Sequence, residues 1–497
     1  MTKLDDVVVE TSQGRLRGSR ADGVAVFKGI PYAAPPFGER RLRAPLRAAG
    51  WDGVRDATAF GPTAPNTGYA PPFDQLFPDP EIPGEDCLTV NVWTPDVGAR
   101  GLPVMVWIHG GAFRNGTSAA AIYDGTAFAR EGVVLVSCNY RLGIDGFLLL
   151  DDEVPNRGLL DQVAALEWVQ EHVAAFGGDA GNVTVFGESA GAISVCALLT
   201  MPRARGLFRR AIAQSGGGHH GLPPEDARRV TAWIADRLGV TRTREGLASA
   251  DLASVKAAQA QLGLEIATKP DPERWGRLAL DVMPFEPAID GEVLPILPID
   301  AVAAGAGADV PMLTGVTAEE WRLFVVPPGR IDMLGEQHVA MALAAYGAAD
   351  ASVSAVYRAL GGAPGDRLCA VTTDWFLRVP AIRLAEARAG GPTRTHLYEF
   401  AWRSPQFGGR LGACHGLELP FLFDTLATDG GHAFAGDAPP RSLGDRMRSA
   451  WVAFARDGDP GWPAYEPERR SVMVFDERSE VTEDPHGDRR RAWDGRR

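Results

Sequence analysis

The chain has 497 residues, of which 45% are hydrophobic and 23% are charged, as in an ordinary globular protein. Its 50 Lys and Arg against 63 Asp and Glu give a formal net charge of −13, which argues against nucleic acid or an anionic membrane surface as a partner. The N-terminus lacks the apolar core of a signal peptide, and the longest apolar runs are too short to cross a membrane. Five cysteines without a Cys-x-x-Cys pair favour a reduced, cytoplasmic protein with neither a structural disulfide nor a zinc cluster.

The N-terminal part predicts edge strands and then a long irregular segment. Residues 7–18 alternate apolar and polar side chains around Gly14, and residues 24–30 continue the pattern, which predicts antiparallel hairpin strands at a sheet edge. Residues 31–83 are rich in Pro and Gly with little periodicity. They form either the rim of a site or a plain surface loop, and the sequence favours neither.

The middle of the chain alternates strands with helices. Strands are predicted at residues 87–93, 103–109, 133–140, 183–186 and 210–215. Residues 103–109 are apolar almost without interruption, as expected for a strand buried on both faces. Apolar positions of residues 158–176 fall at helical spacing, and two glycines end that helix. Strand–helix–strand alternation indicates a parallel sheet with crossover helices.

Two Ala-rich and charge-rich regions, roughly residues 223–310 and 331–390, have helical spacing and predict helical insertions over the sheet. The remaining core elements are strands at residues 311–315 and 394–402 and a closing helix at residues 442–456. We interpret the whole chain, 1–497, as one domain. Its basic tail, about 486–497, is more typical of a solvated terminus than of an interaction tail.

Residues 187–191 read Gly-Glu-Ser-Ala-Gly, with a short apolar strand before them and a helical pattern after them. A G-x-S-x-G pentapeptide between a strand and a helix is typical of a nucleophile elbow, in which the serine is exposed on a strained turn. Side chains at Gly187 or Gly191 would collide with the neighbouring strand and helix. The alternative is an ordinary turn with a buried serine.

A serine nucleophile requires a histidine base and an acid that orients it. The candidate histidines after the elbow are His219, His220, His338, His396, His415 and His432. His415 lies in a Gly-rich loop after a late strand, where the catalytic loop of such a fold is expected. His396 lies within a strand pattern and is interpreted as a core residue, and His219 and His220 as loop residues near the site rim.

Several further motifs make the chain resemble the type B carboxylesterase/lipase family, which includes cholinesterases and bacterial p-nitrobenzyl esterases. The matching stretches, in family order, are residues 85–88 (EDCL), 109–113 (HGGAF), 139–143 (NYRLG), 158–162 (GLLDQ), 176–179 (FGGD), 187–191 (GESAG), 214–216 (QSG), 315–321 (GVTAEEW) and 412–421 (GACHGLELPF). The resemblance implies an α/β-hydrolase fold, with a mostly parallel central sheet flanked by helices and with helical insertions over the active site.

The resemblance implies Ser189 as the nucleophile, Glu320 rather than Glu319 as the triad acid, and His415 as the base. An oxyanion hole needs backbone N–H donors. Ala190, which follows the nucleophile, supplies one of them. The resemblance assigns the others to Gly111 and Ala112. Glu188, Asp161 and Arg141 are interpreted as members of buried polar networks.

The substrate pocket and the departures from the family pattern come from the same resemblance. Phe113, Leu323 and Phe324 occupy positions that imply an acyl pocket. Trp321 stands where the family usually has glycine. Cys87 matches a cysteine that forms a disulfide in relatives from oxidising compartments, but residues 60–64 contain no cysteine to pair with it.

These observations predict a serine carboxylesterase that acts on a small-molecule ester through an acyl-enzyme, without a metal or cofactor, as a monomer or homodimer. Alternatives with the same triad are an acyltransferase or a hydrolase of lactones, carbamates or polyketide-type esters. A catalytically inactive binding protein on this fold is a further alternative, although such proteins lose the nucleophile or its partners. Choline esters are a poor substrate candidate, because no tryptophan before Cys87 is placed to hold a quaternary ammonium.

Overall fold

The computed structural model describes residues 5–281 and 283–496. Within them, a 13-stranded sheet has the order β1-β2-β3-β5-β7-β6-β8-β9-β10-β11-β12-β13, and β4 pairs with β2. The strands are β1 (Asp5–Thr11), β2 (Gly14–Ala21), β3 (Val24–Pro31), β4 (Val54–Asp56), β5 (Thr89–Thr94), β6 (Leu102–Ile108), β7 (Val134–Cys138), β8 (Gly178–Glu188), β9 (Arg210–Gln214), β10 (Met312–Thr317), β11 (Thr395–Phe400), β12 (Ser471–Phe475) and β13 (Glu480–Glu483).

The middle of the sheet is parallel, and its rims are antiparallel except for β4, which pairs in parallel with β2. Neighbours from β7 to β12 pair in parallel, whereas β1, β2, β3 and β5 at one rim and β13 at the other pair antiparallel. Every residue of β7, β9, β10 and β11 is buried, as expected for parallel strands covered on both faces. The predicted edge hairpins and buried core strands are confirmed.

The α-helices are α1 (Phe73–Leu76), α2 (Thr126–Arg130), α3 (Gly143–Phe147), α4 (Arg157–His172), α5 (Ala190–Thr200), α6 (Pro224–Leu238), α7 (Arg244–Ala248), α8 (Leu252–Thr268), α9 (Pro272–Trp275), α10 (Leu278–Asp281), α11 (Pro298–Ala303), α12 (Arg322–Val325), α13 (Glu336–Ala345), α14 (Ala351–Ala359), α15 (Pro364–Thr373), α16 (Val379–Arg388), α17 (Leu419–Leu422), α18 (Asp429–Ala435), α19 (Arg441–Asp457) and α20 (Gly487–Ala492). Shorter turns are η1 (Gly38–Arg40), η2 (Ala121–Tyr123), η3 (Val173–Phe176), η4 (Pro202–Ala204), η5 (Ile331–Met333) and η6 (Asp374–Arg378).

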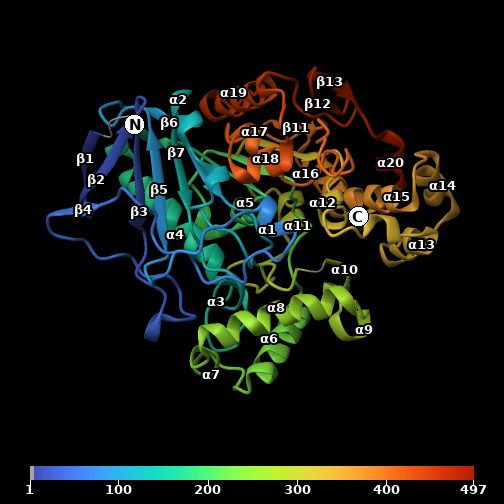
Figure 1. Ribbon diagram of the computed structural model, residues 1–497, viewed down its shortest axis with the longest axis horizontal. Helices are drawn as coiled ribbons and strands as arrows, with labels where there is room; N and C mark the ends of the chain where they lie inside the picture. Colours follow the sequence, from blue (N-terminus) through green and yellow to red (C-terminus); the bar gives the residue numbers. More distant parts are fainter. Residues whose placement is uncertain (1–4, 282, 497) are drawn as a thin grey trace.

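The helices between the core strands form two groups. Figure 1 shows α6 to α9, in green, together at the bottom of the view, and α13 to α15, in gold, at the right. The first group is joined to α3 by Gln259, whose Oε1 accepts a hydrogen bond from Ile144 N at 2.7 Å. The division of the chain into a single domain with two insertions stays a prediction.

The C-terminal segment differs from the solvated tail that the sequence predicts. It forms α20, and the Trp493 side chain is fully buried. Arg489 donates to Asp374 at 2.6 Å, and His486 contacts Glu399 at 2.9 Å. The basic charge of this segment is therefore matched by buried carboxylates from distant elements, which the local sequence does not reveal.

Among the described residues, no helix combines the length and the apolar character needed to span a bilayer. The five cysteines are all buried and carry free thiols.

Candidate active site

Strand β8 ends in the elbow, and α5 starts immediately after it. Ser189 lies between them with φ 57° and ψ −123°, a left-handed conformation that costs a non-glycine residue energy and that clusters at functional sites. Ser189 N donates to Gln214 O at 2.9 Å, and Ser189 O accepts from Ile193 N at 2.9 Å. Ser189 is partly exposed, whereas residues 183–188 and 190–199 are buried, so the strained turn presents this serine toward solvent.

The two elbow glycines lie where the predicted collisions occur. A Cβ on Gly191 would be 2.0 Å from Ile108 O, and a Cβ on Gly187 would be 2.6 Å from the same atom. Both distances are far inside van der Waals contact, and the obstacle is backbone of β6, which cannot move aside cheaply. The expectation that a side chain at either position would collide is confirmed.

Replacement of Gly191 by alanine is therefore expected to destabilise the protein. Because the new methyl group must displace β6 backbone, we expect a loss of about 1–3 kcal/mol or more in the free energy of unfolding, measured as a lower midpoint in thermal or urea unfolding. Gly335→Ala is the control, because its Cβ would meet nothing within 4 Å. Equal stability of the two variants would contradict the proposed packing.

The loop after β6 lies against the nucleophile. A Cβ on Gly110 would be 3.1 Å from Ser189 Cβ. Gly111 and Ala112 follow with φ 116° and φ 53°, and both are partly exposed. A turn in which Asn115 N donates to Gly111 O at 2.9 Å closes the loop. The loop that carries Gly111 and Ala112 therefore starts beside the serine, and the oxyanion role of its backbone N–H groups stays a prediction.

His415 and Glu320 form a buried pair. The distance from His415 Nδ1 to Glu320 Oε2 is 2.6 Å. The other carboxylate oxygen of Glu320 accepts from Thr317 N at 2.8 Å and from Ser215 Oγ at 2.7 Å. Three donors therefore fix this carboxylate, and it in turn fixes the imidazole ring, which is the arrangement that a histidine base needs.

The other ring nitrogen of His415 faces Glu188. His415 Nε2 lies 3.0 Å from Glu188 Oε1. Burial lowers the pKa of His415, but the negative charges of Glu188 and Glu320 outweigh it and raise the pKa well above the ordinary value. The interpretation of Glu188 as a buried acid that pairs with its neighbours agrees with this contact, although the sequence did not reveal that the neighbour is His415.

Glu319 has different partners from Glu320. Its carboxylate accepts from Arg322 Nε at 2.7 Å and from Ala413 N at 3.0 Å, and it also pairs with Arg403. It thus braces the loop before His415 without touching the imidazole. The contacts favour Glu320 over Glu319 as the acid that orients the base.

A model of the carboxylesterase family matches residues 5–493 of the chain. The chain belongs to the carboxylesterase family. It is 37% identical to the para-nitrobenzyl esterase of Bacillus subtilis over 97% of both chains. It is 34% identical to the liver carboxylesterase of Sus scrofa, over 94% of this chain and 89% of that protein.

Solved structures agree with this membership. A carboxylesterase of Geobacillus stearothermophilus is 39% identical, covers 98% of this chain and 99% of its own, and superposes with a TM-score of 0.85. Together with the mostly parallel sheet, this neighbour confirms the predicted α/β-hydrolase fold. The protein is a carboxylic ester hydrolase, as the family and its named esterase relatives indicate.

The three residues predicted to line the acyl pocket of this carboxylesterase differ in exposure. Phe324 is 37% exposed, and its ring centroid lies 5.5 Å from that of His415. Leu323 is only 2% exposed and Phe113 is fully buried, with the Phe113 ring 4.7 Å from Phe147. Phe324 alone of the three presents surface beside the base in this structure, and the pocket role of the other two stays a prediction.

Trp321, which departs from the family pattern, packs outward from the acid. Its ring centroid lies 4.7 Å from that of Phe324 and 5.4 Å from that of Phe376 in η6, and the backbone N–H of Trp321 donates to Thr373 Oγ1 at 3.1 Å. The tryptophan therefore ties the segment that follows Glu320 to the second helical group, while Glu320 keeps its contact with the imidazole.

Sequence reasoning missed a third buried carboxyl group in this carboxylesterase. Glu418 is fully buried. Burial, together with the charges of Glu188 and Glu320, raises its pKa, which favours its protonated form. Gln214 Nε2 donates to Glu418 Oε1 at 3.4 Å. The only signal in the sequence was the position of Glu418 in the motif around His415.

The other polar assignments fall outside the catalytic contacts. His396 is buried, as predicted for a core residue, whereas His220 is a buried partner of Glu286 at 3.1 Å rather than a residue of an exposed rim. Arg141 and Asp161 form a fully buried ion pair at 2.6 Å. This pair confirms the predicted core polar network.

Proposed function

We propose that this carboxylesterase hydrolyses carboxylic esters through an acyl-enzyme, with Ser189 as nucleophile, His415 as base and Glu320 as the acid that orients the imidazole. The observation that carries the proposal is the 2.6 Å contact between His415 Nδ1 and Glu320 Oε2, beside a serine held at φ 57° on an elbow. A nucleophile, a base and an orienting group in this order are what acyl transfer requires.

The reaction begins when the imidazole takes the proton of the Ser189 hydroxyl. For this step His415 must be neutral, and its Nε2 must leave Glu188 Oε1 and accept a hydrogen bond from the Ser189 hydroxyl; Glu188 and Ser189 are adjacent residues. Ser189 Oγ then attacks the ester carbonyl carbon, and the imidazolium is stabilised by Glu320. The protonated His415 next gives its proton to the departing alkoxide, which leaves the acyl group on Ser189.

Water completes the cycle. His415 takes a proton from a water molecule, the resulting hydroxide attacks the acyl carbon, and the carboxylic acid leaves as Ser189 recovers its proton. In both acylation and deacylation the carbonyl oxygen becomes negative, and the backbone N–H groups of Gly111, Ala112 and Ala190 are proposed to donate to it. Each such donor typically contributes ~10²–10³ in turnover.

A hydrolysis series with p-nitrophenyl acetate, butyrate, octanoate and palmitate tests the proposal. We expect turnover on the shorter esters, since the exposed ring of Phe324 beside His415 offers a limited apolar wall for an acyl chain. The chain-length optimum measures the size of the acyl pocket. A folded protein without turnover on any of these esters would contradict a general esterase and would favour a specialised ester, lactone or carbamate.

Activity is expected to depend on pH through His415, which must be neutral to act as a base. Because carboxylates hold its pKa above the ordinary value, kcat/KM falls as the pH drops through a point higher than that of an unperturbed histidine. Glu188→Gln removes one of those negative charges, lowers the pKa and moves this acidic limb to lower pH. The measurement is kcat/KM for p-nitrophenyl acetate at intervals across the pH range.

Glu319→Gln is the matched control for the pH experiment. Glu319 is a partly buried glutamate next to the triad acid, but its carboxylate contacts Arg322 and Arg403 instead of the imidazole. The acidic limb of the kcat/KM profile of Glu319→Gln is expected to stay at the wild-type pH. If the acidic limb of the kcat/KM profile of Glu188→Gln lies at the wild-type pH or above it, Glu188 does not raise the pKa of His415.

The state of the cysteines supports a proposal for the cellular location. Five buried free thiols agree with a reducing compartment, and we propose that the enzyme acts in the cytoplasm.

A further inference from the structure

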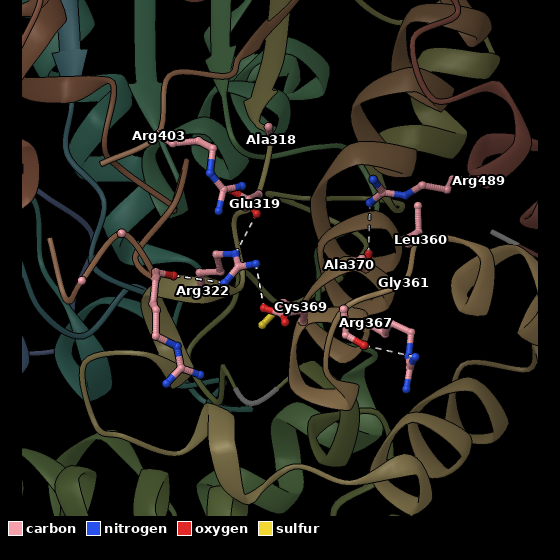
Figure 2. Close-up of a pocket in the computed structure, with 15 residues that line it drawn as sticks. Ala318, Glu319, Arg322, Leu360, Gly361, Arg367, Cys369, Ala370, Arg403 and Arg489 are labelled. Atoms are coloured by element: carbon pink, nitrogen blue, oxygen red, sulfur yellow. Dashed lines mark hydrogen bonds and ion pairs between the residues drawn. The ribbon is translucent and has the colours of Figure 1, made fainter. Parts of the chain in front are cut away.

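The arginines that line the cavity beside Glu319 are all paired with carboxylates. This cavity has a volume of about 500 Å³, and Figure 2 shows Arg322 and Arg403 next to Glu319 at one side of it and Arg489 at the other. Arg322 pairs with Glu319 at 2.7 Å, and Arg489 pairs with the buried Asp374 at 2.6 Å. The other lining arginines also have acidic partners: Arg367, Arg403 and Arg410. The charge of these guanidinium groups is therefore already matched within the fold.

Arg114, two residues after Ala112, has no such partner. In the part of the chain that the structure describes, its guanidinium group forms no ion pair, and its Nε is buried without a hydrogen-bond partner. Burial lowers the pKa of Arg114, and no described carboxylate offsets this effect. The residue is still partly exposed. Of its three nitrogens only Nε is both buried and unpaired, so Nη1 and Nη2 keep accessible surface through which a ligand can reach them.

A glycine of the first helical group makes room for this guanidinium group. Gly263 lies in the interior of α8, where glycine is a poorer helix former than alanine. A Cβ on Gly263 would be 2.2 Å from Arg114 Nη1 and 3.5 Å from Arg114 Cζ, and outside the backbone of its own helix it would meet no other described atom within 4 Å. The glycine therefore accommodates the guanidinium group, which has a defined place against α8.

Arg114 extends from the turn that carries two of the proposed oxyanion donors. Its backbone N–H donates to Gly111 O at 3.1 Å. The same loop starts beside the nucleophile, because a Cβ on Gly110 would be 3.1 Å from Ser189 Cβ. From this turn the side chain reaches Gly263. An ester held at Ser189 therefore lies next to the turn from which the guanidinium group extends.

Two aromatic residues connect Arg114 to the loop of the proposed base. Burial raises the pKa of the Tyr69 hydroxyl, Glu188 raises it further, and Arg114 lowers it, so both charges lie near this hydroxyl. The Tyr69 ring stacks on Phe77 with centroids 5.0 Å apart. A Cβ on Gly416, the residue after the base, would be 3.7 Å from Phe77 Cζ and 3.8 Å from Glu188 Oε1. Arg114 therefore belongs to the surroundings of the proposed catalytic residues.

We propose that this carboxylesterase acts on esters that carry a free carboxylate, and that Arg114 binds this carboxylate. The inference rests on the proposed function, since it names the substrate class of the same site. A guanidinium fork matches the two oxygens of a carboxylate. The net charge of −13 repels an anionic substrate, and an unpaired cation beside the site offsets that repulsion locally. A neutral ester leaves Arg114 unpaired, so the site favours the charged ester.

Two matched pairs of esters test the proposal by kinetics. p-Nitrophenyl hydrogen adipate carries a carboxylate on its acid part and is compared with p-nitrophenyl hexanoate. 4-Acetoxybenzoate carries a carboxylate on its alcohol part and is compared with 4-acetoxybenzamide. In at least one pair, Arg114→Gln is expected to lower the ratio of kcat/KM for the charged ester to that for the neutral ester by about tenfold to a hundredfold. The pair that responds shows which part of the ester carries the carboxylate, and an unchanged ratio in both pairs overturns the proposal.

Two further variants separate position from charge. Gly263→Ala keeps the guanidinium group but displaces it, because the new Cβ would be 2.2 Å from Nη1. Alanine favours the helix, so this variant is expected to fold and to lower the same ratio. Arg209→Gln is the control, since Arg209 is exposed and precedes β9 at the end opposite the elbow. An equal fall in Arg209→Gln would show a general effect of charge and would overturn the assignment to Arg114.

A binding measurement separates failure of this inference from failure of the proposed function. Monomethyl adipate and 4-acetoxybenzoate are titrated by calorimetry into Ser189→Ala, and then into the same variant with Arg114→Gln added. We expect saturable binding of at least one of them, weakened about tenfold or more by Arg114→Gln. Absence of saturable binding by both, or binding that Arg114→Gln leaves unchanged, overturns the inference. Turnover of the neutral esters by the wild type decides the proposed function separately.

Discussion

Ser189→Ala is expected to lower kcat for ester hydrolysis by about 10⁶-fold, the loss that follows removal of the nucleophile in a serine hydrolase. The variant keeps the elbow backbone but has no hydroxyl to attack the ester, so no acyl-enzyme forms. Initial rates with p-nitrophenyl butyrate measure the loss. Mass spectrometry of the intact protein after brief mixing with the ester detects the acyl adduct in the wild type.

Ser194→Ala is the control for the nucleophile. Ser194 is a buried serine one turn further along α5, where it accepts from Gln162 Nε2 at 3.1 Å. Its loss removes one hydrogen bond and is expected to leave kcat within a few fold of the wild type. Undiminished turnover in Ser189→Ala, or an acyl adduct on that variant, would remove Ser189 from the mechanism.

Glu320→Gln is expected to lower kcat by about 10⁴-fold, as the equivalent acid-to-amide change does in another serine hydrolase. The amide keeps the shape of the side chain, but it no longer stabilises the imidazolium and can donate to Nδ1, which selects the wrong tautomer of His415. The loss should appear in kcat with little change in KM, since Glu320 is fully buried and cannot reach the substrate.

Glu319→Gln is the matched comparison for the triad acid. Both glutamates lie in the same turn after β10, yet only Glu320 contacts the imidazole. We expect Glu319→Gln to retain turnover within about tenfold of the wild type, because it loosens Arg322 and Arg403 without altering the tautomer of His415. A larger loss in Glu319→Gln than in Glu320→Gln would reverse the assignment.

The elbow was predictable because its determinants are local. The strand, the glycines and the helix are consecutive, and the collisions that make glycine necessary at position 191 involve β6, which the apolar pattern had already placed as a buried strand. The sheet was predictable for the same reason, since apolar runs and helical spacing are properties of short segments.

The electrostatics of the site were not predictable, because they depend on contacts between distant segments. Glu188 was known to adjoin the serine, but its 3.0 Å approach to His415 Nε2 joins residues far apart in the chain. The charge pattern predicts that Arg489 belongs to a solvated tail, whereas Asp374 holds it against the second helical group. A composition or a charge run does not specify such partners.

Modification of the buried cysteines by a thiol-reactive dye reports local opening of the fold. Burial raises the pKa of Cys138 and Cys196 to about 12 and that of Cys414 well above its usual range, so thiol-reactive dyes meet no thiolate until a segment exposes its cysteine. Cys138 ends a central strand, Cys196 lies in the helix behind the nucleophile, and Cys414 precedes the base. The order in which dye modifies them under native conditions therefore measures whether the loop that carries His415 detaches while the sheet stays closed.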